Sequence, residues 1–87
     1  MKIKDGFILR EVADSYLVVA VGEAVKQFNG VINLNETGAF LWKLLEKGCD
    51  EKGLKDALLA EYDVDEETAA ADIKAFVEKL KEADLII

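Results

Sequence analysis

The chain has 87 residues, of which 52% are hydrophobic and 33% charged, and its formal net charge is −7. This length fits one small domain, and we expect residues 1–87 to form it around one apolar core. The sequence contains no run of about 18 apolar residues that would predict a membrane span, and residues 1–6 do not predict a secretory leader.

The negative charge is concentrated in residues 50–67, which contain eight acidic residues and only two basic ones, Lys52 and Lys55. This region would repel a phosphate backbone. The chain also lacks the clustered Lys and Arg that nucleic-acid binding requires. The electrostatics therefore disfavour nucleic acid as a partner.

The first half of the chain predicts an antiparallel sheet. Residues 7–12 and 16–21 are rich in strand-forming residues, and residues 13–15 predict the tight turn between them. The second of these strands is almost continuously apolar, which is typical of a central strand.

A third strand is predicted at residues 31–34, after a connection at residues 22–29. Within this connection, Val25 and Phe28 either extend the third strand backwards or pack as a loop flap. Asn29 and Gly30 both tolerate positive φ and predict a turn. Because side chains alternate along a strand, Ile32 and Leu34 should share one face, with Val31 and Asn33 on the other.

The second half predicts three helices, over residues 36–47, 51–62 and 66–83, capped by Asn35, Asp50 and Asp65. Gly48 should end the first of them. The predicted buried stripes are Leu41, Leu44 and Leu45, then Leu54, Ala57, Leu58 and Tyr62, then Ile73, Phe76, Val77 and Leu80. The order of three strands and then three helices predicts an α+β fold.

Two further features are predicted for the second half. The i,i+4 pairs Glu51–Lys55 and Lys52–Asp56 should lie on the solvent side of the second helix. The apolar tail, residues 85–87, should be removed from water.

The usual groups of catalysis and metal binding are missing from the sequence. It has no histidine, and its single cysteine, Cys49, precludes an internal disulfide and is typical of a cytoplasmic protein. It shows no phosphate-binding loop and no nucleophile elbow. The acidic residues 63–67 mark a helix start, where capping explains them. We therefore expect a binding module that is not an enzyme and needs no metal or cofactor.

At this point the sequence resembles the PqqD family, small peptide-binding proteins also described as RiPP recognition elements. The resemblance covers residues 7–87 and rests on an ordered set of short matches: Leu9-Arg10, Tyr16 to Val19, Val31 to Asn35, Gly38, Trp42, Glu61 to Val64, Asp72-Ile73, Phe76, Leu80 and Leu85-Ile86. It implies a winged-helix-like fold of three antiparallel strands and three helices. It also implies a protein that binds the leader segment of a ribosomally made precursor peptide and presents it to a modifying enzyme, often a radical SAM protein.

The resemblance further implies where that peptide binds. It should add as an extra strand beside the third strand and lie against the third helix. The implied edge is Val31, Ile32, Asn33 and Leu34, and the implied groove wall falls among Ala69, Asp72, Ile73, Phe76 and Lys79. The chain departs from the family in its longer connection at residues 23–28 and in having Val21-Gly22 where the family often has a proline.

The mechanism is also physically sensible without the resemblance. An open sheet edge offers unpaired N–H and C=O groups to an extended peptide. Two other functions share the same predicted fold, namely a winged-helix DNA-binding regulator and a structural subunit that dimerises through its sheet edge.

Overall fold

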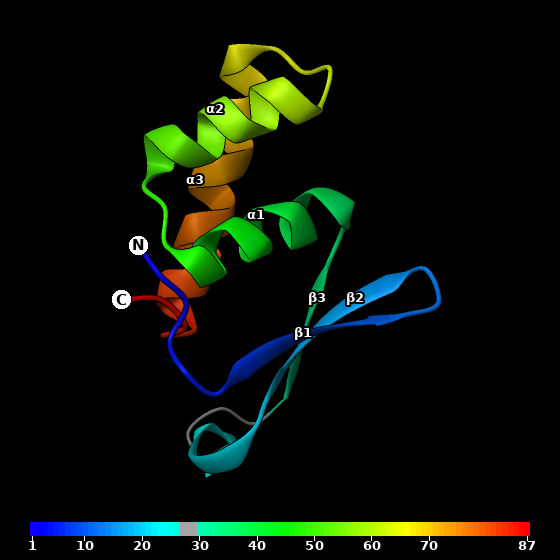
Figure 1. Ribbon diagram of the computed structural model, residues 1–87, viewed down its shortest axis with the longest axis vertical. Helices are drawn as coiled ribbons and strands as arrows, with labels where there is room; N and C mark the ends of the chain where they lie inside the picture. The colour runs from blue at the N-terminus through cyan, green and yellow to red at the C-terminus, as the bar shows by residue number, and fades with distance from the viewer. Residues whose placement is uncertain (27–29) are drawn as a thin grey trace.

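The computed structural model describes residues 1–26 and 30–87, which form an α+β fold (Figure 1). The elements, in chain order, are β1 (Phe7–Val12), β2 (Ser15–Ala20), the 3₁₀ helix η1 (Gly22–Lys26), β3 (Val31–Leu34), α1 (Glu36–Lys47), α2 (Glu51–Glu61) and α3 (Glu66–Glu82). The predicted order of strands and helices is confirmed. No helix among the described residues is long and apolar enough to cross a membrane.

The sheet is antiparallel and has the order β1-β2-β3, so β2 is the central strand, as predicted. Its register aligns Leu9 with Val18 and Val18 with Ile32. These side chains share one face, and Val18 is completely buried. The helices cover this face, while the β1–β2 hairpin extends beyond them (Figure 1).

Trp42 lies at the centre of the core and is 0% exposed. The face of α1 is rotated slightly from the predicted one, because Leu41, Trp42 and Leu45 are buried and Leu44 is only partly buried. The other core residues come from all parts of the chain: Ile3, Leu34, Leu54, Leu58, Ala69, Ile73, Phe76, Val77, Leu80, Leu85 and Ile86.

Each helix begins where a side chain accepts a backbone hydrogen bond. Asn35 Oδ1 accepts from the N–H of Gly38 at 2.7 Å, and Asp50 and Asp65 make the equivalent bonds at 2.7 and 2.6 Å. These bonds satisfy N–H groups that have no partner within the helix. All three predicted caps are confirmed, and so is the end of α1 at Gly48, where φ is 97°.

The two ends of the chain pair with each other. Ile3 and Ile86 form an antiparallel bridge, and the N–H of Lys4 donates to the carbonyl of Leu85 at 2.8 Å. A salt bridge of 2.7 Å between Lys4 Nζ and Asp84 reinforces this pairing. Local sequence patterns do not predict this pairing, because it joins residues that are 80 or more positions apart.

Some details of the sequence-based expectation are wrong, and one lies outside the described residues. Lys55 pairs with Glu66 of α3 at 3.0 Å, because α2 and α3 pack side by side, and no ion pair joins it to Glu51 among the described residues. No ion pair joins Lys52 to Asp56 among the described residues either. Val25 lies in η1 and does not extend β3, while the expectation for Phe28 falls outside the described residues. Of the apolar tail, Leu85 and Ile86 are buried as predicted, whereas Ile87 remains 75% exposed.

Candidate functional site

The outer edge of β3 is open among the described residues. β3 pairs with β2 on one side and with no other described strand. The C-terminal tail pairs with residues 2–4 and lies apart from β3, so it does not cover this edge (Figure 1). β3 therefore offers unpaired backbone donors and acceptors, which can hydrogen-bond an added strand.

A groove lies between this edge and α3, with a cavity volume of about 270 Å³. We call it the β3–α3 groove. It is lined by Asn33, Leu34, Asn35, Thr37, Gly38, Leu41, Asp72, Ala75, Phe76 and Lys79. The lining thus combines three elements, namely β3, the first turns of α1, and one face of α3.

The floor of the β3–α3 groove is apolar. Leu34 and Phe76 are each 9% exposed, and Leu41 is 1% exposed. A small part of two core side chains therefore reaches the surface here, and an apolar side chain entering the groove would gain contact with the core. The rim is polar and exposed, with Asn33 on the strand and Asp72 and Lys79 on α3.

The tight junction of β3 and α1 shapes one end of the groove. Gly38 is buried in the first turn of α1, and a Cβ at this position would lie 3.2 Å from Asn35 Oδ1 and 3.3 Å from Leu34 Cβ. The small residue thus lets the N-cap and the end of β3 approach each other. The sequence singled out Gly38 only through the family resemblance.

The structure brings together five of the nine residues that the sequence placed at the site. Asn33, Leu34, Asp72, Phe76 and Lys79 line the groove. Ile32 is partly buried on the helix-covered face of β3, and Val31 is 54% exposed on the opposite face.

The other two residues, Ala69 and Ile73, lie in the core and are 0% and 2% exposed. Residues 69, 73, 76 and 80 follow each other at helical spacings of four, three and four, so they form the stripe of α3 that faces the core. Asp72, Ala75 and Lys79 lie next to that stripe and reach the groove. Sequence reasoning missed Ala75, although its spacing of three from Asp72 and four from Lys79 places it on their face.

Two tyrosines lie close to the start of α1. A hydrogen bond to Glu11 and the charge of that residue raise the pKa of Tyr16, with smaller effects from burial, Glu36 and Tyr62. Burial raises the pKa of Tyr62, followed by the charges of Glu36 and Glu61. Both phenols therefore stay protonated at neutral pH.

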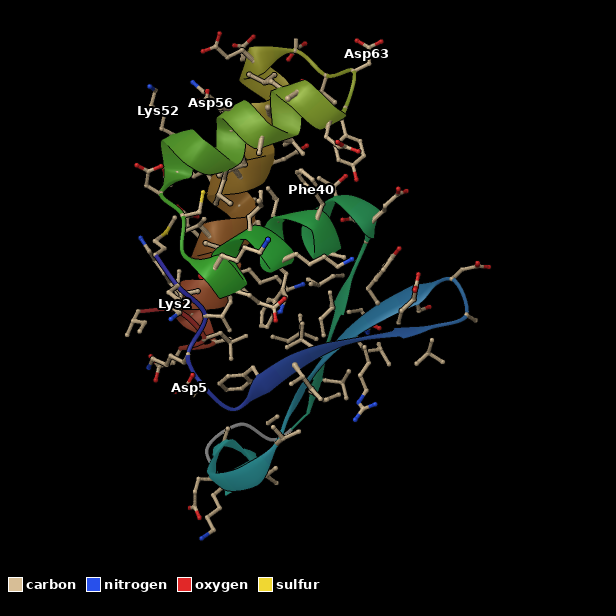
Figure 2. The ribbon with its side chains drawn as sticks, in the orientation of Figure 1. Lys2, Asp5, Phe40, Lys52, Asp56 and Asp63 are labelled. Atoms are coloured by element: carbon tan, nitrogen blue, oxygen red, sulfur yellow. The ribbon has the colours of Figure 1, made fainter. Side chains whose placement is uncertain are left out.

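Tyr62 is also held by an aromatic contact. Its ring packs edge to face against Phe40, with centroids 5.5 Å apart, and Figure 2 shows Phe40 pointing from α1 toward α2. This contact joins the two helices and lies outside the groove lining. Within residues 1–26 and 30–87, no group of three His, Cys, Asp or Glu side chains is placed to hold a metal ion.

The sequence and the fold are both similar to those of known proteins. The sequence matches the family described as "Coenzyme PQQ synthesis protein D (PqqD)" over residues 9–86. No curated protein matches the chain. Among solved structures, TbiB1 in complex with the TbiA(beta) leader peptide has 28% identity and a TM-score of 0.77, with 98% of this chain and 93% of that chain covered.

A second solved structure shares the fold. Lasso peptide synthetase B1, complexed with the leader peptide, has 23% identity and a TM-score of 0.72, with 93% of this chain and 89% of that chain covered.

Proposed function

Because the chain belongs to the PqqD family, we propose that it binds the leader segment of a ribosomally synthesised precursor peptide by strand addition to β3. In this proposal the bound peptide lies in the β3–α3 groove and is presented to a modifying enzyme, with a radical SAM maturase as the expected partner. The chain itself acts as an adaptor and not as an enzyme, with residues 1–87 working as one peptide-binding unit in the cytoplasm.

The observation that carries the proposal is the position of the open strand edge. The unpaired edge of β3 borders a groove whose opposite wall is α3. An extended peptide can form backbone hydrogen bonds with β3 while alternate side chains enter the groove. The solved complex of TbiB1 with a leader peptide supports a leader peptide as the ligand, and lasso peptide synthetase B1 shares the fold.

The energetics are sufficient for a useful affinity. Each backbone hydrogen bond contributes about 0.5–1.5 kcal/mol net. Four to six such bonds and one buried apolar side chain reach about micromolar affinity after the peptide has been ordered. The bonds do not depend on peptide sequence, so the groove must supply the selectivity.

Proline substitutions in β3 test strand addition, because neighbouring residues of a strand direct their N–H groups to opposite sides. Of Ile32→Pro and Asn33→Pro, one removes a hydrogen bond to β2, and the other removes a donor on the open edge. The variant that loses only a donor on the open edge keeps the β2–β3 pairing intact and should fold like the wild type.

The experiment measures fluorescence anisotropy of a labelled candidate leader peptide. Circular dichroism identifies which proline variant keeps the fold, and that variant should bind several-fold more weakly than the wild type. Glu11→Pro, on the opposite edge of the sheet and with its N–H directed away from β2, is the matched control and should bind as the wild type does. Unchanged affinity in the folded β3 variant would contradict strand addition.

A further inference from the structure

The β3–α3 groove carries two opposite charges, one on each side of its apolar floor. Asp72 lies one helical turn before Phe76, and Lys79 lies one turn after it. Both side chains are exposed, and neither forms an ion pair or a side-chain hydrogen bond with another residue of the described ranges. They are therefore free to pair with charges on a ligand.

From this arrangement, and resting on the proposed function, we propose that the groove selects peptides by the order of their charges. The preferred segment has a basic residue, an apolar residue two positions later and an acidic residue two positions after that. The basic side chain pairs with Asp72, the apolar one covers Phe76, and the acidic one pairs with Lys79.

The spacing follows from the geometry of a helix and a strand. Asp72 and Lys79 are seven residues apart, which is about 10 Å along a helix. Peptide residues four positions apart lie about 13 Å from each other in a strand and point to the same side. The long, flexible side chains of Lys, Arg and Glu accommodate the difference.

The order of the charges follows from chain direction. Every strand pair in the sheet is antiparallel, and an added strand that continues this pattern runs opposite to β3. Figure 1 shows that β3 and α3 also run in opposite directions. The peptide therefore runs in the direction of α3 and passes Asp72 before Lys79.

The two ion pairs are solvent-exposed, so each contributes little to affinity. Reversing the charge order replaces two attractions with two repulsions, and the expected loss is about fivefold in affinity at low salt. This difference should shrink at high salt, because exposed charges are screened. The charges thus set selectivity and peptide direction, while the backbone bonds and the apolar contact supply the affinity.

The test is selection from a phage-displayed library of random 12-residue peptides. The baits are the wild type and the charge-swapped variant D72K/K79D, whose substitutions lie at exposed positions and should not affect folding. The matched control K74D/E78K makes the same kind of swap at exposed α3 positions that do not line the groove. Each selected pool is then tested against the folded β3 proline variant.

The wild type and the control should enrich the order basic, apolar, acidic. The charge-swapped variant should enrich acidic, apolar, basic. Identical motifs in all three pools, with binding still lost in the folded β3 proline variant, would overturn the charge rule and leave the proposed function standing. Pools whose binding survives the proline, or failure to enrich any peptide, would overturn the proposed function itself.

Discussion

Asn35 is the residue through which the sheet is joined to the helices. It follows β3 directly, caps α1, and lines the β3–α3 groove. Its side chain accepts a hydrogen bond from the N–H of Gly38 at 2.7 Å, which holds the first turn of α1 against the end of β3.

Asn35→Ala should therefore destabilise the fold by about 1 kcal/mol, the usual contribution of an N-cap. Urea unfolding followed by circular dichroism measures the difference. Asn33→Ala is the matched control, because Asn33 is exposed and makes no side-chain hydrogen bond to another described residue. Its effect should stay within about 0.5 kcal/mol. Equal losses in the two variants would show that the cap bond does not stabilise the protein.

Asp65 makes the stability of α3 depend on pH. The backbone N–H of Thr68 donates to its carboxylate, and this bond lowers the pKa of Asp65 below its ordinary value. A lowered pKa means that folding favours the ionised form. The contribution is fully present above the carboxyl group's ordinary pKa and is lost as the pH falls through the lowered one.

Asp65→Asn keeps an N-cap side chain but removes this titration. Its free energy of unfolding should therefore fall less steeply than that of the wild type as the pH is lowered below about 4. Asp63→Asn removes the same charge from a side chain that points away from the helices into solvent (Figure 2), and it serves as the control. Acid slopes of the same size in wild type and Asp65→Asn would refute the assignment.

At the scale of elements, the chain ends form a clamp. Ile3 is 6% exposed and Ile86 is 9% exposed, and their bridge ties the segment before β1 to the segment after α3. Ile3→Ala should cost about 2–5 kcal/mol, because it removes buried methyl groups from the core. Ile87→Ala, at a 75% exposed position, should change stability by less than about 0.5 kcal/mol. Thermal and urea unfolding measure the loss of stability in Ile3→Ala and in Ile87→Ala. Equal losses in the two variants would exclude a stabilising clamp.

The elements that the sequence predicted well depend on neighbouring residues. The three caps and the stop at Gly48 are local signals, and α1 begins and ends where they place it. The alternation in β3 also held, with Leu34 buried and Asn33 exposed. Such features follow from side-chain chemistry within a few residues.

The features that the sequence missed depend on tertiary packing. The Ile3–Ile86 bridge joins distant segments, and the Lys55–Glu66 pair replaced a local i,i+4 pair once α2 lay beside α3. The site was predicted only in part, because its lining also depends on tertiary packing. The resemblance placed it on β3 and α3, but only the rotation of α3 decides that Asp72 reaches the groove while Ile73 enters the core.

At the scale of the whole molecule, binding surface and charge are separated. The excess of acidic residues lies in residues 50–67, and Figure 2 shows Lys52, Asp56 and Asp63 at the end of the molecule remote from the sheet. The β3–α3 groove instead presents one acidic and one basic rim residue over an apolar floor. The net charge of −7 therefore does not describe the surface that a peptide would meet.

The most direct test is amide hydrogen exchange of β3, measured by NMR with and without a bound leader peptide. Strand addition predicts that two alternate amides of the four in β3 become protected, either those of Val31 and Asn33 or those of Ile32 and Leu34, while the amides of β1 do not change. Protection confined to residues 50–67, or gained on the β1 edge, would contradict it.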